Sequence, residues 1–182
     1  MSEKQYNELA VPTAELSEFI LKIPGEHFFC ETISLPAKLE GEDELGFNNA
    51  LKSFVQTILQ DTSFSPYPEE QLACGYYGEQ NGRRAIIFAC PSFKLRQQGW
   101  QNLEIFRRVF PSFVSLFGKK FTEPTVIFLQ EGETLTIASF EADSSVPDQI
   151  FSLPVDLEDS ESLKKARGKL LSLVDTSKYE VI

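Results

Sequence analysis

His27 is the only histidine in the sequence, and any conventional nucleophilic mechanism in this chain would depend on it. Ser-His-Asp and Cys-His schemes both use a histidine as the general base that activates the nucleophile. His27 lies in the segment HFFCETISL, whose aromatic and β-branched residues are typical of a strand. No GxSxG sequence accompanies it. We therefore predict a structural role for His27, and a single histidine cannot build a His-rich metal site.

Carboxylates are the other groups that could do chemistry. They are densest in one cluster, formed by Asp156, Glu158, Asp159 and Glu161. Acidic residues at this spacing could bind a metal ion through oxygen atoms alone, and the sequence leaves that alternative open. The cluster also lies where a helix is predicted to begin, and anions at that position cap free N–H groups and complement the helix dipole. Capping is the interpretation that we favour.

Motifs that bind phosphate through a glycine-rich loop are absent from the sequence. There is no GxxxxGK(S/T), and no GxGxxG follows a predicted strand. The net charge of −10 also disfavours binding to nucleic acid, because an acidic surface repels a phosphate backbone.

Charge is distributed unevenly along the chain. Residues 94–120 carry a net charge of +5, whereas the rest of the chain carries −15. This basic segment forms either a solvated face or a docking face for an acidic partner or an anionic membrane surface. Arginine and aromatic residues are enriched at binding hot spots. We therefore predict that the partner-binding residues are Trp100, Phe106, Arg107 and Arg108.

The remaining composition indicates a folded cytoplasmic protein. Hydrophobic residues make up 42% of the 182 residues, which is enough for a core. No apolar run is long enough to span a membrane, and the polar N-terminus does not resemble a signal peptide. The three cysteines, Cys30, Cys74 and Cys90, lie in apolar segments without close spacing, which favours reduced core thiols.

The first half of the chain alternates between strand and helix patterns. Residues 1–16 are predicted to form a flexible arm, and strands are predicted at residues 19–23 and 27–35. An amphipathic helix follows, because seven apolar residues recur at helical spacing between Phe47 and Leu59. Pro66 and Pro68 prevent the helix from continuing. Two further strands, residues 71–77 and 83–90, are joined by a turn at Asn81-Gly82.

The second half is predicted to contain two helices and a hairpin. Residues 93–108 follow a helical pattern with Phe93, Trp100, Leu103 and Phe106 as apolar contacts, although Gly99 weakens it. A short helix is predicted after Pro111. From residue 124 the order is β-β-β-α-β: a hairpin around Glu131-Gly132-Glu133, a strand over 148–155, a helix from Asp159 or Ser160 to Val174, and the strand KYEVI. Ribonuclease-H-like and actin-like cores begin with the same order of elements.

One phrase carries a family resemblance. Residues 14–90 resemble the actin-like ATPase-fold proteins of type IV pilus and type II secretion assembly, the pilus assembly protein M and secretion protein L families. Members of these families carry an sPfP-x-(D/E)-Q motif between a helix and the next strand. The matching residues are Ser65, Pro66, Tyr67, Pro68, Glu70 and Gln71.

The resemblance implies an α/β (α+β) fold of actin-like or ribonuclease-H-like lobes. The first lobe would cover residues 17–118 and contain an inserted strand-helix-strand-strand module at 27–90. The second would cover 119–182, with an end inside a strand, as expected of the cytoplasmic part of a longer membrane-anchored protein. Pro66, Tyr67 and Pro68 would then form a structural joint that ends the helix and directs the next strand into the inserted sheet.

The sequence also departs from the family pattern. Nucleotide-binding members carry an Asp-x-Gly phosphate loop in the second-lobe hairpin, where this chain has Gln130-Glu131-Gly132. The position of the other phosphate loop falls in the polar arm 1–16. The resemblance therefore implies a fold without an ATP site and without a cofactor.

Such a protein would be a non-catalytic scaffold, cytoplasmic and peripheral to the inner membrane, with membrane-anchored or cytoplasmic assembly proteins as partners. The alternative is a Mg²⁺-dependent enzyme or nucleotide-binding protein on a ribonuclease-H-like core. A third interpretation is an acidic module unrelated to secretion.

Overall fold

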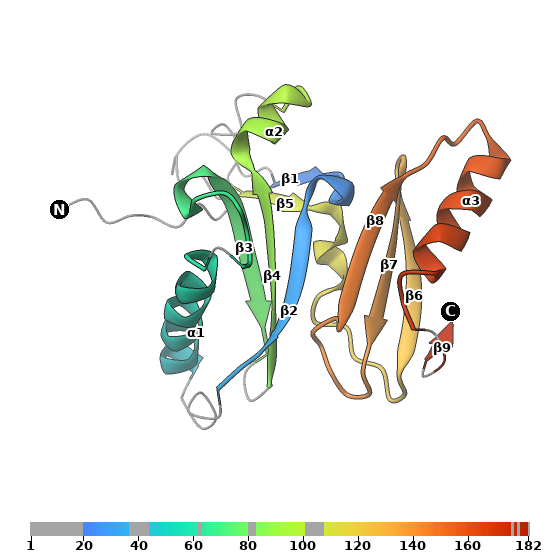
Figure 1. The fold of residues 1–182 in the computed structure, drawn as a ribbon. Coiled ribbons are helices and arrows are strands. Elements are labelled where there is room, and N and C mark those ends of the chain that lie inside the picture. Colours follow the sequence, from blue (N-terminus) through green and yellow to red (C-terminus); the bar gives the residue numbers. More distant parts are fainter. Residues whose placement is uncertain are drawn as a thin grey trace.

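The fold is mixed α/β and consists of four layers, a helix, two sheets and a second helix (Figure 1). The computed structural model describes residues 20–36, 44–61, 63–79, 83–100, 108–175, 177 and 179–181. The predicted arm, residues 1–16, and the predicted Asn81-Gly82 turn lie outside these residues. No helix among them is long and apolar enough to cross a membrane.

The first sheet has three antiparallel strands, which are β2 (Phe29–Ser34), β3 (Leu72–Gly78) and β4 (Arg84–Pro91). Their spatial order is β2-β4-β3, so the last strand in the chain is the central one. Helix α1 (Glu44–Leu59) covers one face. It buries Phe47, Leu51, Val55 and Leu59 against that face, which confirms the predicted apolar stripe.

The second sheet has four strands in the order β8-β7-β6-β9. These are β6 (Thr125–Glu131), β7 (Thr134–Phe140), β8 (Gln149–Pro154) and β9 (Glu180–Val181). Helix α3 (Ser160–Leu171) packs on the outer face of this sheet. The predicted order β-β-β-α-β is confirmed, although α3 ends before the predicted Val174.

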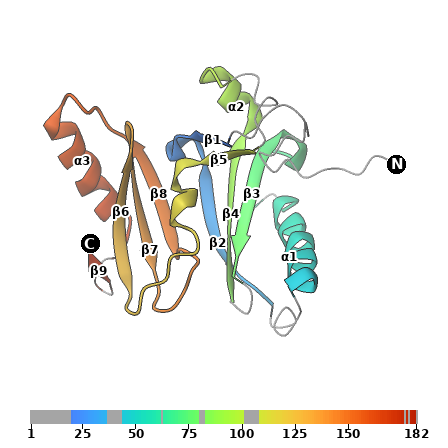
Figure 2. The ribbon, with the colours of Figure 1, turned by 180° about the vertical axis from the view of Figure 1, so that it is seen from behind.

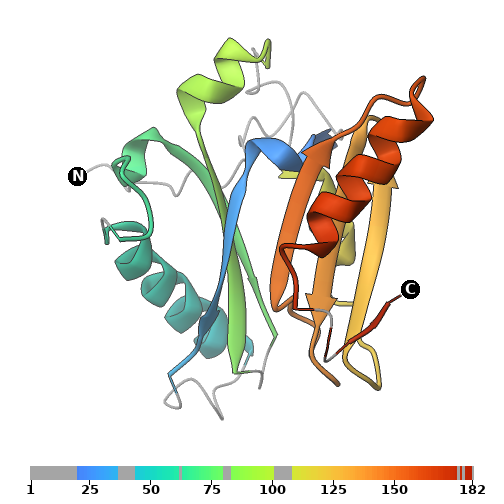
Figure 3. The ribbon, with the colours of Figure 1, turned by 45° about the vertical axis from the view of Figure 1, so that its right-hand side comes forward.

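The two sheets pack face to face and share a core rich in phenylalanine (Figure 3). Phe88 of β4 and Phe113 of the 3₁₀ helix Ser112–Leu116 lie edge to face, with ring centroids 6.2 Å apart. In the view from behind (Figure 2), that short helix lies between the two sheets. Gly25, in the turn before β2, permits this turn to approach Ser152 and Phe113 closely. A Cβ at this position would lie 2.6 Å from Ser152 Oγ and 2.7 Å from Phe113 Cδ1.

A third, two-stranded sheet joins β1 (Ile20–Ile23) to β5 (Arg108–Pro111) in parallel. β1 precedes the strand-helix-strand-strand segment in the chain and β5 follows it. That this segment is an inserted module stays a prediction. The division into lobes at residues 118 and 119 stays a prediction.

Two sequence predictions about local structure were wrong. The helix predicted over 93–108 is the six-residue α2 (Ser92–Gln97), and Arg108 already belongs to β5. Gly99 has φ +89°, a left-handed conformation that ends a helix and that glycine adopts without strain. His27 lies in the 3₁₀ helix Gly25–His27 and not in a strand, because the strand begins only at Phe29.

Candidate functional site

The β6–β7 hairpin, where the family resemblance places a phosphate loop, ends in a very tight turn. Glu131 pairs with Thr134, so only Gly132 and Glu133 lie between the strands. Gly132 has φ +57°, which suits the first central position of a two-residue turn. A turn of this length offers few backbone N–H groups to a phosphate, whereas phosphate loops surround the anion with several.

Carboxylates at this hairpin tip are already engaged by the protein itself. Lys22 of β1 forms an ion pair with Glu131, with 3.2 Å between Nζ and Oε1. Thr134 Oγ1 donates a hydrogen bond of 2.8 Å to Glu26 Oε2. The tip therefore presents acidic side chains and joins β1 to the second sheet.

The acidic cluster before α3 caps the helix, as the sequence predicts. Asp159 is the N-cap, and its side chain accepts a 2.9 Å hydrogen bond from the backbone N–H of Glu161. Asp156 accepts a similar bond from Glu158 N–H, and Glu161 forms an ion pair with Lys164. Among the described residues, no group of three or more His, Cys, Asp and Glu side chains is placed to hold a metal ion.

The three cysteines lie in apolar surroundings. Cys74 and Cys90 are buried, and none of the three forms a disulfide. Burial raises the pKa of the Cys90 thiol to about 11 and that of Cys30 further still. A thiol with a raised pKa is a poor nucleophile near neutral pH, which agrees with the predicted core role.

The segment Pro66-Tyr67-Pro68 forms a packed connection between α1 and β3. Ser65 is buried, and its hydroxyl accepts a hydrogen bond of 3.1 Å from the Tyr67 N–H. Pro68 precedes a single 3₁₀ turn, Glu69–Gln71, that leads directly into β3. The Tyr67 ring lies 5.6 Å from the Phe93 ring of α2. The structural role of this joint stays a prediction, and these contacts are consistent with it.

The described cations of the basic segment 94–120 do not form one continuous face. Lys94 and Arg96 lie on α2, which follows Pro91, whereas Lys120 forms an ion pair with Glu79, which follows Gly78. In the register of the first sheet, Pro91 pairs with Leu72, and Gly78 pairs with Ala85 at the other end. The two ends are roughly 20 Å apart at about 3.3 Å per strand residue. The charge of these described residues is therefore divided between opposite ends of the sheet.

At the α2 end, cations lie beside exposed aromatic surface. Phe93 is 40% exposed, although the sequence predicts it as an inward contact. Lys94 Nζ lies 6.0 Å from the centre of the Tyr67 ring. Lys94 and Arg96 are exposed, and neither forms an ion pair within the described residues. We call Tyr67, Phe93, Lys94 and Arg96 the α2 surface.

The structure places the predicted partner-binding residues only in part. Trp100 is half-buried against a small core that includes Leu95 and Cys90, so part of its ring is a structural contact. Phe106 and Arg107 lie outside the described residues. Arg108 begins β5, with only its backbone described. The partner-binding role of these residues stays a prediction.

The sequence analysis did not predict that the joint at Pro66-Tyr67-Pro68 contacts the start of α2, beside the basic segment. Tyr67 and Phe93 are far apart in the chain, and they meet because Leu72 pairs with Pro91, which brings the start of β3 beside the end of β4. The available signal was the prolines that precede β3 and the proline that ends β4. They mark neighbouring ends only once antiparallel pairing is assumed.

Comparisons with known proteins returned structural neighbours only. No protein-family model matches the sequence, and no curated protein matches it. One similar solved structure is the cytoplasmic domain of EpsL, an inner membrane component of the type II secretion system of Vibrio cholerae. It has a TM-score of 0.43 and 12% identity and covers 74% of this chain and 50% of that chain.

Two further structures show a similar likeness. The PilM-PilN type IV pilus biogenesis complex has a TM-score of 0.46 and 9% identity, covering 84% of this chain and 52% of that chain. A Bacteroides thetaiotaomicron protein with an actin-like ATPase fold and unknown function has a TM-score of 0.37 and 13% identity, covering 89% of this chain and 57% of that chain.

These neighbours are of the kinds that the sequence pattern resembles: secretion, pilus and actin-like ATPase-fold proteins. The chain spans between 50% and 57% of the length of these solved chains. With TM-scores below 0.5, no site or activity is transferred from them.

Proposed function

We propose that this protein is a non-catalytic scaffold of a type IV pilus or type II secretion-like assembly and that it acts through protein–protein contacts. In this proposal it is cytoplasmic and peripheral to the inner membrane, where it contacts membrane-anchored or cytoplasmic assembly proteins. The resemblance at Ser65–Gln71 supports the class of assembly. The α2 surface supports the mode of action.

The observation that carries the proposal is that exposed aromatic surface lies beside positive charge at the α2 surface, and that no described carboxylate forms an ion pair with this charge. Phe93 is 40% exposed and contacts Tyr67, so the two rings form an apolar contact area. Lys94 and Arg96 stand beside them in a chain of net charge −10. An acidic segment of a partner protein would complement both features, because aromatic residues and arginine dominate binding hot spots and complementary charge speeds association.

The hairpin tip supports the non-catalytic part of the proposal. A nucleotide of the actin-like fold needs backbone donors at this hairpin and an acid that orients Mg²⁺. Here the turn has two residues, and Gln130 occupies the position of the acid. Glu131 is held by Lys22, and Glu26 lies at the same tip. A triphosphate brought there would meet negative charge and few donors.

Titration calorimetry with Mg-ATP tests the absence of nucleotide binding. We expect no heat beyond dilution at millimolar nucleotide. Gln130→Asp alone should not create binding, because the turn would remain too short. A saturable signal with micromolar affinity would overturn the scaffold proposal and favour the Mg²⁺-dependent alternative.

Affinity capture from the source organism, with identification of the captured proteins, tests the assembly role. We expect assembly components of a pilus or secretion system, and we expect Phe93→Ala with Arg96→Glu to lose them. Arg107→Glu with Arg108→Glu should weaken capture in the same way, with little loss of fold. Lys119→Glu is the matched control, since it removes a charge from the same basic segment at the other end of the sheet. Equal capture by all four proteins would favour a solvated basic face.

A further inference from the structure

Helix α3 has an outer face that is strongly basic. Residues 162–174 contain no acidic residue and four basic ones, which are Lys164, Lys165, Arg167 and Lys169. All four are exposed. Lys164 forms an ion pair with Glu161, with 3.1 Å between Nζ and Oε1, and within the described residues no carboxylate forms an ion pair with the other three. The outer face of α3 therefore carries net positive charge in a chain whose net charge is −10.

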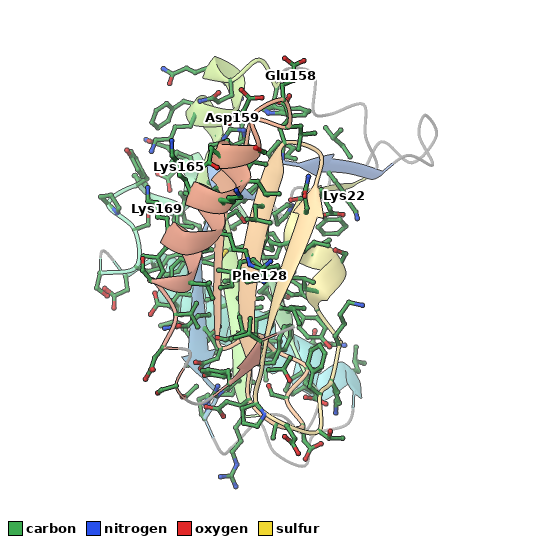
Figure 4. All side chains as sticks on the ribbon, turned by 90° about the vertical axis from the view of Figure 1, so that its right-hand side faces the viewer. Lys22, Phe128, Glu158, Asp159, Lys165 and Lys169 are labelled. Carbon is green, nitrogen blue, oxygen red and sulfur yellow. The ribbon has the colours of Figure 1, made fainter. Side chains whose placement is uncertain are left out.

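The helical repeat places these cations on both flanks of Gly168. Residues four apart lie on the same face of a helix, so Lys165 and Lys169 form a row along one flank. Arg167 belongs to the other flank, where its guanidinium lies 4.6 Å from the centre of the Phe128 ring of β6. Figure 4, which looks onto this face, shows Lys165 and Lys169 on one side of α3 and Phe128 on the other. At 3.6 residues per turn, Gly168 lies between the two flanks and points away from the sheet.

The packing of the described residues does not require a glycine at position 168. A Cβ at this position would meet no heavy atom within 4 Å, and the backbone does not adopt a positive φ there. Glycine in the interior of a helix is destabilising relative to alanine, because it loses more conformational freedom on folding. Its missing side chain allows another backbone to approach the helix closely. Gly168 therefore has an evident use at a contact with another molecule.

The helix dipole explains only part of this charge. Cations stabilise a helix within its last turn, and α3 ends at Leu171, so the dipole accounts for Lys169. Lys165 lies in the middle of the helix, beyond the reach of this effect. Lys165 and Lys169 are also like charges four residues apart, an arrangement that destabilises a helix. A carboxylate bound between them would convert this repulsion into attraction.

Two other occupants fit this face poorly. A helix that binds a lipid surface does so through apolar side chains that insert, and Gly168 has none to offer between its flanking cations. The net charge is −10, so the chain without its four α3 cations carries −14, which an anionic membrane would repel. A second copy, related by a two-fold axis at Gly168, would place Arg167 of one copy opposite Lys169 of the other. Cations would then meet cations across the junction.

We propose that the outer face of α3 binds an acidic helix of a partner protein, which crosses α3 at Gly168. Helix axes pack about 8–10 Å apart, depending on the side chains at the contact, and a glycine at the crossing point permits the shorter distance. Carboxylates on both flanks of the bound helix pair with Arg167 on one side and with Lys165 and Lys169 on the other. Acidic residues four apart on the bound helix match the spacing of the two lysines. The α2 surface follows the first sheet and α3 covers the second, so either surface can fail without the other.

The probe for this proposal is a stapled helical peptide of alanine and glutamate, with glutamates on both flanks of a row of alanines. The control peptide has lysine in place of each glutamate. Binding is followed by NMR titration of the full chain, and affinity is taken from the shifts of the Lys165, Gly168 and Lys169 amides, so that binding elsewhere does not contribute. We expect the acidic peptide to shift these amides, with an affinity that falls as salt is added. The lysine peptide should bind there at least about tenfold more weakly.

Matched variants test the charge. Lys165→Glu with Lys169→Glu should weaken the acidic peptide at least about tenfold. Lys94→Glu with Arg96→Glu makes the same change in net charge at the α2 surface and should leave the affinity at α3 unchanged.

A second pair of variants tests the close approach. Gly168→Leu keeps every charge and adds a side chain where the described residues leave room, and leucine favours a helix more than glycine does. We therefore expect it to melt no lower than the unmodified protein and to bind the acidic peptide about tenfold more weakly. Gly168→Ala adds a single carbon atom and should weaken binding less.

Several results would overturn the proposal. Acidic-peptide shifts that appear only outside α3, or normal binding by the lysine-to-glutamate variant, would exclude the basic face as the site. Normal binding by Gly168→Leu would exclude a helix that crosses at this residue. Vesicles of phosphatidylserine and phosphatidylcholine that shift the α3 amides when the acidic peptide does not would make a membrane the occupant. A dimer, seen by sedimentation, that Gly168→Leu disperses would make a second copy the occupant. Loss of capture in the α2-surface variants would leave this test unaffected, and so the two proposals fail separately.

Discussion

The two ends of the first sheet use their positive charges in opposite ways. At the Gly78 end, Arg84 forms ion pairs with Glu141 at 2.5 Å and with Asp148 at 2.7 Å. Lys120 forms an ion pair with Glu79 at the same end. At the α2 end, Lys94 and Arg96 have no such partner among the described residues. The first set of charges links elements of the protein, whereas the second forms no ion pair within the part of the chain that the structure describes.

This difference separates a structural region from a candidate binding region. Arg84 belongs to the first sheet, and both of its acidic partners belong to the second sheet or its connections, so these pairs help to hold the sheets together. Tyr179, just before β9, extends the network by donating a bond of 3.2 Å to Asp148. The net charge along the sequence did not distinguish the structural region from the candidate binding region. The positive charges at both ends of the first sheet lie within the basic segment or close to it in the chain.

The largest effect on stability is expected in the apolar core between the two sheets. Phe113→Ala should lower the free energy of unfolding by about 3–5 kcal/mol, because Phe113 is almost fully buried between the sheets and its loss leaves a cavity. Phe93→Ala, at the α2 end, should cost about 1 kcal/mol or less, the value of one exposed aromatic contact. Denaturant unfolding of both variants measures the contrast. Equal losses would mean that Phe93 is a core residue and not part of a binding surface.

The second effect concerns the charges themselves. Arg84→Ala should lower the free energy of unfolding by roughly 2 kcal/mol, because it leaves Asp148 and Glu141 without their charged hydrogen-bond donor. Arg96→Ala removes the same side chain from the α2 end and should change stability by less than about 0.5 kcal/mol. The pair of variants is compared by chemical denaturation at neutral pH. A similar cost for both would remove the distinction between the two ends.

The third effect concerns the joint beside the α2 surface. Pro66→Ala together with Pro68→Ala should lower stability by about 1 kcal/mol, since the unfolded chain gains freedom and the entry into β3 is less well fixed. Thermal melting measures the change, and a melt unchanged within error would argue against a structural joint. If the joint also orients Tyr67 toward Phe93, the same variant should weaken partner capture at the α2 surface.

Much of this fold could be predicted from local pattern. The stripe from Phe47 to Leu59 predicts α1 because a helix repeats its face every three to four residues, and the structure buries that face. The β-β-β-α-β order followed from strand patterns and from the cap at Asp159. These features depend on neighbours in sequence, which is why a single sequence reveals them.

The features that needed the structure depend on residues far apart in sequence. The face-to-face contact of the sheets joins Phe28, Phe88 and Phe113, and periodicity reports only that each segment has an apolar face. The prediction of a helix over 93–108 was wrong because an apolar pattern alone did not account for the left-handed Gly99, which ends α2 after six residues. The basic segment was interpreted as a single face because a count of charges along the sequence does not show that Lys120 forms an ion pair with Glu79.

The smallest effect is a pH dependence at the Gly78 end. Burial would raise the pKa of Glu79, but the hydrogen bonds from Lys120 and Ser145 and the Lys120 charge together outweigh it, so the pKa lies below its ordinary value of 4.5. A carboxyl whose pKa is depressed by folding stabilises the protein above the unfolded pKa. That stabilisation is lost as the pH falls below 4.5 and through the lower folded pKa. Glu79→Gln lacks the titrating group. Its deficit in stability relative to the unmodified protein should therefore be constant near neutral pH and should shrink in that acidic window.

Denaturation midpoints of the two proteins at a series of pH values measure this convergence. Arg96→Gln, at the α2 end, should run parallel to the unmodified protein throughout, because Arg96 pairs with no described carboxylate. A deficit in Glu79→Gln that stays constant through the acidic window would show that Lys120 does not bind Glu79 as a charged partner.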